Sequence, residues 1–184
     1  MLHFELEDIL PVSPLQEGLL FHALYDTEGP DVYTTQLIFA LEGCVDEPSL
    51  KAAAQALLQR HANLRAGFRH EGLKQPVQII PKEVLLLWHR MDLSSLERHE
   101  QRRHLEEWLE EDRRHRFDVA SPPLLRFTLI RLDEEQYQLV LTVHHILMDG
   151  WSMPVLVREL FGLYERKGDA GSLPRVTPYR DYLA

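Results

Sequence analysis

The sequence has little cysteine and no long apolar run. Cys44 is its only cysteine, so no disulfide can form within the chain. Hydrophobic residues make up 45% of the 184 residues, but they are interspersed with polar ones. None of their runs approaches the ~18 consecutive apolar residues that cross a bilayer. The N-terminal segment also lacks the basic cluster of a secretory signal or transit peptide. These absences predict a soluble protein with no membrane partner, located in the reducing cytoplasm.

An excess of basic residues is also lacking. The chain has 29 acidic and 20 basic side chains, which gives a formal net charge of -9 with the histidines neutral. A protein that follows a phosphate backbone needs a basic surface, so we expect no nucleic-acid partner. The length suits one domain with a substantial core, or one half of a larger unit.

The hydrophobic pattern alternates between helical and strand periods. Ser13 and Gln16 flank Pro14 as in a capping box, which predicts a helix start. Helical spacing predicts helices over residues 14 to about 25, 46 to about 61, a mostly solvated helix within 92–116, and a helix from about 154. Alternation predicts strands over residues 33–41, one or two short strands within 75–88, and a hairpin of 124–132 with 137–145. The Gly- and Pro-rich stretch 168–178 is predicted to be a connector.

The stretch VHHILMDGWS, residues 143–152, carries the clearest chemical signal. Its two histidines, His144 and His145, end a predicted strand, in which successive side chains point to opposite faces. Adjacent imidazoles that diverge in this way do not readily bind one metal ion, and no cysteine lies nearby to help. We therefore expect no metal site here.

His145 falls on the apolar face of that strand, so the ring would be partly desolvated and biased toward its neutral form if that face is covered. A neutral imidazole can accept a proton or hold an amine. Asp149 and Gly150 follow in a turn, where the carboxylate can brace the backbone and the glycine relieves a clash. From the residues alone two interpretations stay open: a core histidine followed by an ordinary turn, or an imidazole that does proton chemistry.

Residues 144–150, HHILMDG, match the HHxxxDG signature of the condensation domains of nonribosomal peptide synthetases and of the wider chloramphenicol acetyltransferase-like acyltransferases. Further motifs follow the family's order. Residues 13–22, SPLQEGLLFH, resemble its opening motif, residues 60–68, RHANLRAGF, resemble RHxxLRxxF, and residues 179–184, YRDYLA, resemble the start of YxDY.

The second of these motifs departs from the family pattern. Ala62 and Ala66 stand where many relatives carry Glu and Thr, which puts the local polar contacts of that motif in doubt.

The resemblance implies an α/β fold, of the α+β sandwich kind, in which a mixed β-sheet is flanked by helices. It further implies that residues 1–170 form one chloramphenicol acetyltransferase-like lobe, the N-terminal one of two. Residues 171–184 would be a connector toward a C-terminal lobe that is missing from this chain. A lobe without its partner is expected to expose an apolar face and to self-associate.

The resemblance also implies the chemistry, which is amide formation in antibiotic-type peptide biosynthesis. A donor acyl or peptidyl thioester and an acceptor aminoacyl thioester would arrive on the 4′-phosphopantetheine arms of peptidyl carrier proteins, with adenylation domains as neighbours. No cofactor would bind the chain directly, and the lobe alone would be weak or inactive. His145 would be the catalytic residue, either as general base or by positioning the amine and stabilising the tetrahedral intermediate.

Four residues would support the catalytic histidine. By resemblance, Asp149 is expected to pair with Arg65 and so fix the loop that aims His145. His144 would serve loop structure, and the backbone at Gly150 would lie beside the reacting thioester.

Two alternatives remain from other classes: an epimerisation-domain lobe, in which the histidine exchanges a proton at an α-carbon, and a non-catalytic lobe that docks carrier proteins. Within the condensation domains, the opening motif and the ILMDGWSMP segment are similar to those that join a donor ending in a D-residue to an L-residue acceptor.

Overall fold

The computed structural model describes residues 5–26, 29–171 and 173–183, and of Tyr182 the backbone alone. Its strands are β1 (Leu6–Pro11), β2 (Thr34–Glu42), β3 (Gly67–Arg69), β4 (Val77–Pro81), β5 (Trp88–Asp92), β6 (Leu125–Arg131) and β7 (Gln136–His144). Its helices are α1 (Pro14–Tyr25), α2 (Glu47–Arg60), the short 3₁₀ helix η1 (Ala62–Arg65), α3 (Arg98–Arg114), α4 (Ser152–Glu165) and α5 (Tyr179–Leu183).

A four-stranded sheet in the order β2-β7-β6-β5 forms the centre of the fold. The predicted hairpin is present as the antiparallel pair β6 and β7, and β2 lies antiparallel to β7 with Thr34 opposite His144. β5 runs parallel to β6, as the long crossover through α3 requires. The sheet is therefore mixed, which confirms the predicted fold class.

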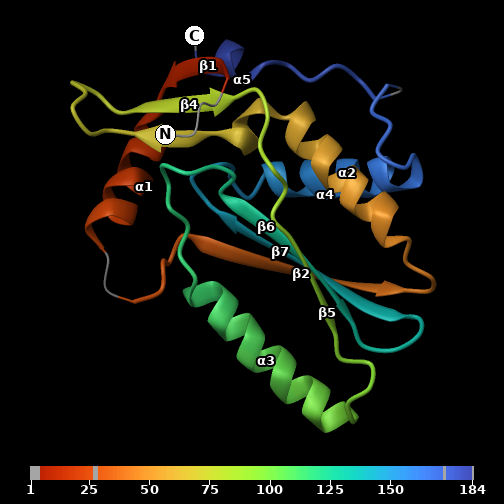
Figure 1. Ribbon diagram of the computed structural model, residues 1–184. Helices are drawn as coiled ribbons and strands as arrows, with labels where there is room; N and C mark the ends of the chain where they lie inside the picture. The colour runs from red at the N-terminus through yellow and green to blue at the C-terminus, as the bar shows by residue number, and fades with distance from the viewer. Residues whose placement is uncertain (1–4, 27–28, 172, 184) are drawn as a thin grey trace.

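Helices cover both faces of this sheet (Figure 1). α2 and α4 lie on one face, and the main core there includes the strand residues Leu139, Leu141 and Val143. α3 lies on the other face, above a small cluster around Ile130 and Val140. None of the residues of α3 is buried, which confirms the prediction of a mostly solvated helix.

A second, three-stranded sheet in the order β1-β4-β3 lies beside α1 and α5 at one end of the molecule (Figure 1). The sequence predicted neither β1 nor β3. Apolar residues do not alternate along β1, and Leu10 is its one buried residue. The pairing of β1 with β4 rests on backbone hydrogen bonds, which leave no such pattern in the sequence. β3 is only three residues long.

The predicted helix start at Ser13 is confirmed in detail. The Ser13 hydroxyl accepts a hydrogen bond from the Gln16 amide, and the Gln16 side chain accepts one from the backbone of Ser13.

The segment after α4 is largely irregular, as predicted, but it is not detached. Ala170, Leu173 and Tyr179 pack against the main core, and the Arg60 guanidinium donates to the Pro174 carbonyl.

In the described part of the chain, no helix is both long and apolar enough to cross a membrane.

Candidate active site

The HHxxxDG segment forms the turn between β7 and α4. β7 ends at His144, and the His145 backbone amide donates to the Tyr33 carbonyl over 2.8 Å. The His145 side chain is exposed, and its ring has no hydrogen-bond partner among the described residues. The condition for partial desolvation, a covered face, is therefore not met in this chain. His145 belongs to the turn that follows β7.

Two hollows adjoin at His145. The smaller, of about 250 Å³, lies toward β2 and α4 and is bounded by Thr35, Leu37, Val143, Met153 and Gly150. The larger, of about 490 Å³, lies toward the start of α1 and is bounded by residues that include Leu15, Leu19, Asn63 and Leu147. His145, Met148 and Asp149 border both. The exposed imidazole is thus accessible from two sides.

His144 is fully buried, and both of its ring nitrogens are bonded. The Ile146 amide donates to Nδ1 over 3.1 Å, so Nδ1 is an acceptor and the ring proton lies on Nε2. Nε2 lies 3.0 Å from a carboxylate oxygen of Asp31. Burial raises the pKa of Asp31, but hydrogen bonds from His144 and the Tyr33 amide, with the nearby positive charge of Arg116, bring the pKa below its usual value. The adjacent histidines therefore have opposite environments.

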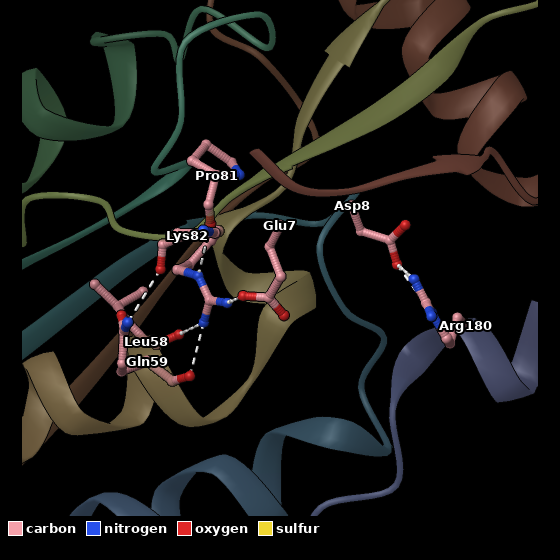
Figure 2. A network of polar contacts seen from close by, with 8 residues as sticks. Glu7, Asp8, Leu58, Gln59, Pro81, Lys82 and Arg180 are labelled. Carbon is pink, nitrogen blue, oxygen red and sulfur yellow. Dashed lines mark hydrogen bonds and ion pairs between the residues drawn. The ribbon is translucent and has the colours of Figure 1, made fainter. Parts of the chain in front are cut away.

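The expected ion pair between Arg65 and Asp149 is not formed, so this expectation is wrong. The Arg65 side chain is only 2% exposed and pairs with the carboxylate of Glu7 on β1. Its remaining donors bond the carbonyls of Leu58 at 2.6 Å, Gln59 at 2.7 Å and Pro81 at 3.0 Å (Figure 2). The last carbonyls of a helix have no partner within the helix, and the end of α2 uses the guanidinium to satisfy them.

Asp149 instead holds the start of α4. Its carboxylate accepts a hydrogen bond from the Ser152 amide at 2.9 Å and from the Ser152 hydroxyl at 2.8 Å. These two bonds lower the pKa of Asp149. A negative charge at the N-terminal end of a helix is favourable because it faces the positive end of the helix dipole. Asp149 thus fixes the direction in which the chain leaves the turn.

Gly150 does not relieve a clash, contrary to the expectation from the sequence. A Cβ atom built on it would meet no atom within 4 Å, and Gly150 is not among the glycines with positive φ. Neither the backbone conformation nor the packing requires glycine here. The position does border the smaller hollow beside His145. A side chain at this position would lie at the edge of that hollow, which His145 also borders.

Sequence reasoning missed the acidic partners of the motif residues. Asp31 and Glu7 carry no periodic or motif signal that could have identified them. Glu159 on α4 is a third such residue: its carboxylate lies 2.9 Å from Arg60 and 2.6 Å from His61 of the RHxxLRxxF motif. Burial raises the pKa of Glu159. The hydrogen bonds from Arg60 and His61 lower this pKa by more, so the net shift is downward. This cluster fixes α2 against α4.

A further ion pair, between the buried Arg126 and the half-buried Asp112 of α3, lies on the face of the sheet that α3 covers. Nε of Arg126 is 2.6 Å from Asp112, whose carboxylate also accepts hydrogen bonds from Thr142 and Gln36, each at 2.6 Å. Burial raises the pKa of Asp112, whereas the bonds from Arg126, Thr142 and Gln36 bring it below its usual value. Thr142 stands two residues before His144 on β7. The network therefore secures the strand that leads into the turn.

The geometry limits what the site can do. An exposed imidazole lies where two hollows meet, on a turn that buried groups hold. Among residues 5–26, 29–171 and 173–183, no three His, Cys, Asp or Glu side chains gather closely enough to hold a metal ion. A histidine in this setting can move a proton or hold an amine by hydrogen bonding. Fold and site together define a mixed α/β protein with an exposed histidine beside two hollows.

Comparison with known proteins gives the family. The family model of the condensation domain matches residues 6–184. One linear gramicidin synthase chain of Brevibacillus parabrevis is 41% identical over 181 residues, which cover 97% of this chain and 4% of that protein. Bacitracin synthase 3 of Bacillus licheniformis is 40% identical over 181 residues, covering 97% of this chain and 3% of that protein. The chain therefore belongs to the condensation-domain family, as its motifs predicted.

Solved structures agree with this assignment. The NRPS cyclization-docking bidomain of EpoB from Sorangium cellulosum superimposes with a TM-score of 0.79 at 25% identity, over 95% of this chain and 34% of that one. The first condensation domain of the calcium-dependent antibiotic synthetase, in complex with a substrate analogue, gives a TM-score of 0.83 at 20% identity and supports the fold alone. That match covers 97% of this chain and 44% of the other. The chain thus spans less than half of either solved chain.

Proposed function

We propose that residues 1–170 are the N-terminal, histidine-bearing lobe of a condensation domain in a nonribosomal peptide synthetase, and that residues 171–184 lead toward the C-terminal lobe. The match to 34% and 44% of two solved chains supports a unit of about half a domain. The order of the motifs supports the N-terminal half. In the complete domain, the exposed side of His145 would face the other lobe.

The proposed reaction is amide formation between an acceptor amine and a donor thioester. The amine nitrogen attacks the thioester carbonyl, the new C–N bond forms, the C–S bond breaks, and the amine proton passes to the leaving thiolate. His145 is the group that holds the amine and conveys this proton. The observation that carries the proposal is the exposed His145 ring, accessible from the two adjoining hollows. Two substrates that enter from different sides need such access.

The partners follow from this reaction. The substrates would be carried as thioesters on the 4′-phosphopantetheine arms of donor and acceptor peptidyl carrier proteins, loaded by neighbouring adenylation domains. The chain itself would bind no cofactor. Because His145 is open to solvent, the lobe alone is expected to be weak or inactive, since water competes with hydrogen bonding at an exposed site. The uncovered side would also allow self-association.

The donor class is a finer part of the proposal. The SPLQEGLLFH and ILMDGWSMP segments support a donor that ends in a D-residue and an acceptor that carries an L-residue. Paired assays with D- and L-ended donors on the same carrier test this point. A rate that favours the L-ended donor would contradict it and leave amide formation untouched.

The main test is reconstitution. The chain is mixed with a matching C-terminal lobe and with carriers loaded with donor and acceptor, and intact-protein mass spectrometry follows the transfer. His145→Ala is compared with wild type, and His89→Ala, which removes another exposed histidine on β5, serves as the matched control. We expect product with wild type and His89→Ala, and at least a hundredfold less with His145→Ala, on the order of the loss expected for a proton-transfer group.

Other results would identify the alternatives. Exchange of the donor α-proton with solvent, without amide formation, would place the chain with epimerisation domains. Carrier binding without either reaction would make it a docking module. Equal product from His145→Ala and wild type would exclude the catalytic role of His145.

A further inference from the structure

Two side-chain amides from distant elements hold the turn that carries His145. Nε2 of Gln16, on α1, donates to the Ile146 carbonyl over 3.2 Å. Nδ2 of Asn63, on η1, donates to the Leu147 carbonyl, also over 3.2 Å. These are consecutive carbonyls, directly after His145. The start of α1 and the RHxxLRxxF segment therefore meet at the backbone of the HHxxxDG turn.

The backbone amides of this turn are bonded as well. The His145 amide donates to Tyr33 over 2.8 Å, the Ile146 amide to Nδ1 of His144 over 3.1 Å, and the Leu147 amide to the His144 carbonyl over 3.1 Å. With the Ile146 and Leu147 carbonyls held by Gln16 and Asn63, three consecutive amides and two consecutive carbonyls of the turn have partners. Such a turn has little freedom to rotate, and the direction of the His145 side chain follows from it.

Gln16 is itself fixed in orientation. It is 6% exposed, and its side-chain oxygen accepts from the Ser13 amide at 3.0 Å and from the Gln78 side chain at 3.4 Å. The oxygen is therefore directed at two donors, which leaves the NH₂ group to face the Ile146 carbonyl. One glutamine caps a helix with its oxygen and holds the turn with its nitrogen.

We propose that Gln16 and Asn63 are positioning residues that aim the His145 ring by holding the two carbonyls that follow it. This inference rests on the proposed function of His145. Both residues also border the larger hollow, so the same bonds keep that wall in place.

Two substitutions separate positioning from helix capping. Gln16→Glu keeps an oxygen that accepts from the Ser13 amide but places a second oxygen, without a proton at neutral pH, against the Ile146 carbonyl. Asn63→Asp does the same to the Leu147 carbonyl from a half-buried site on η1. Gln55→Glu is the matched control. Gln55, on α2, donates to the Val84 carbonyl and accepts from the Leu86 amide, each at 3.2 Å, and both partners lie in the loop between β4 and β5.

The first measurement is amide hydrogen exchange by NMR at residues 145–148, together with the chemical shifts of the His145 ring. We expect faster exchange and a shifted ring in both variants, and neither change in Gln55→Glu. Unchanged exchange and ring shifts in Gln16→Glu and in Asn63→Asp would overturn the proposal. Asn63→Asp decides the matter if Gln16→Glu does not fold.

The second measurement is the kinetics of amide formation in the protein that contains the complete condensation domain. Mispositioning of a catalytic group lowers kcat more than it changes KM, so we expect kcat to fall roughly tenfold to a hundredfold with KM within about twofold. A higher KM at unchanged kcat would instead mean that the two residues touch substrate. If wild type forms no amide, the proposed function fails, whereas the exchange measurement still decides whether the two residues hold the turn.

Discussion

Nε2 of His144 lies 3.0 Å from Oδ2 of Asp31, and the same ring accepts the Ile146 amide through Nδ1. Both ring nitrogens of His144, the first histidine of the HHxxxDG motif, are thus hydrogen-bonded in the buried interior, while its neighbour His145 is exposed. The division comes at the end of β7. His144 is the last strand residue and its buried ring meets Asp31, whereas His145 belongs to the turn and borders the two hollows.

Replacing Asp31 by Ala is expected to destabilise the fold. The change leaves the Nε2 proton of His144 buried without a partner, which costs about 1–3 kcal/mol of unfolding free energy. Urea unfolding at neutral pH measures the loss. Asp118→Ala is the control, since Asp118 accepts a similar backbone bond, from Ala120 at 3.0 Å, on the exposed surface. A loss in Asp31→Ala no larger than in Asp118→Ala would contradict the pairing.

Gly150→Ala is expected to leave stability unchanged and to lower activity. A Cβ at this position meets no atom within 4 Å, so the unfolding free energy should stay within about 0.5 kcal/mol of wild type. The methyl group would narrow the approach to His145, and we expect about tenfold slower amide formation, or ~1.4 kcal/mol in the barrier. Gly162→Ala, on α4, controls for added volume. Full activity in Gly150→Ala would mean that the substrates do not approach this backbone.

Arg65 is expected to couple to Glu7 and not to Asp149. Double-mutant cycles test this with Arg65→Lys combined with Glu7→Gln or with Asp149→Asn, read by urea unfolding. Residues in one ion-pair network couple by about 0.5–3 kcal/mol, whereas independent sites add to within about 0.5 kcal/mol. Asp149→Asn alone should change the free energy of unfolding only slightly, since Asp149 is exposed and only holds the start of α4. Strong coupling between Arg65 and Asp149 would contradict the pairing of Arg65 with Glu7.

Acid should weaken the fold through three partly or fully buried carboxylates. The pKa values of Asp31, Asp112 and Glu159 are all lowered in the folded state. A lowered folded pKa contributes stability that is present above the unfolded pKa and is lost as the pH falls through the folded value. Unfolding free energies measured from pH 7 to about pH 3 should therefore decline, and less steeply in Asp112→Asn, which has lost one such group. Parallel curves for variant and wild type would contradict a lowered pKa at Asp112.

Much of the fold could be predicted from local pattern. The capping box at Ser13, the solvated helix α3 and the β6–β7 hairpin are encoded in neighbouring residues, and the structure confirms them. β1 could not be predicted, because its pairing with β4 depends on backbone hydrogen bonds and not on an apolar period.

The motif predicted which residues make the candidate site, but not their contacts. Of the residues it indicated, His144 ends β7 and His145, Asp149 and Gly150 follow it before α4. Arg65 lies instead beneath the end of α2, where its guanidinium bonds helix carbonyls and Glu7. The Asp149 carboxylate is engaged by Ser152 of the next helix.

By itself, the sequence determined the four longer helices, the β6–β7 hairpin and the family, because these depend on spacing along the chain. Tertiary structure alone decided which acid meets which base and whether His145 is covered. Asp31 stands 113 residues from His144, and Gln16 stands 130 residues from Ile146. A hydrogen bond requires its two heavy atoms to lie within about 3 Å of each other, and sequence spacing does not encode that distance. The packing of sheets and helices therefore determines which of these distant residues become partners.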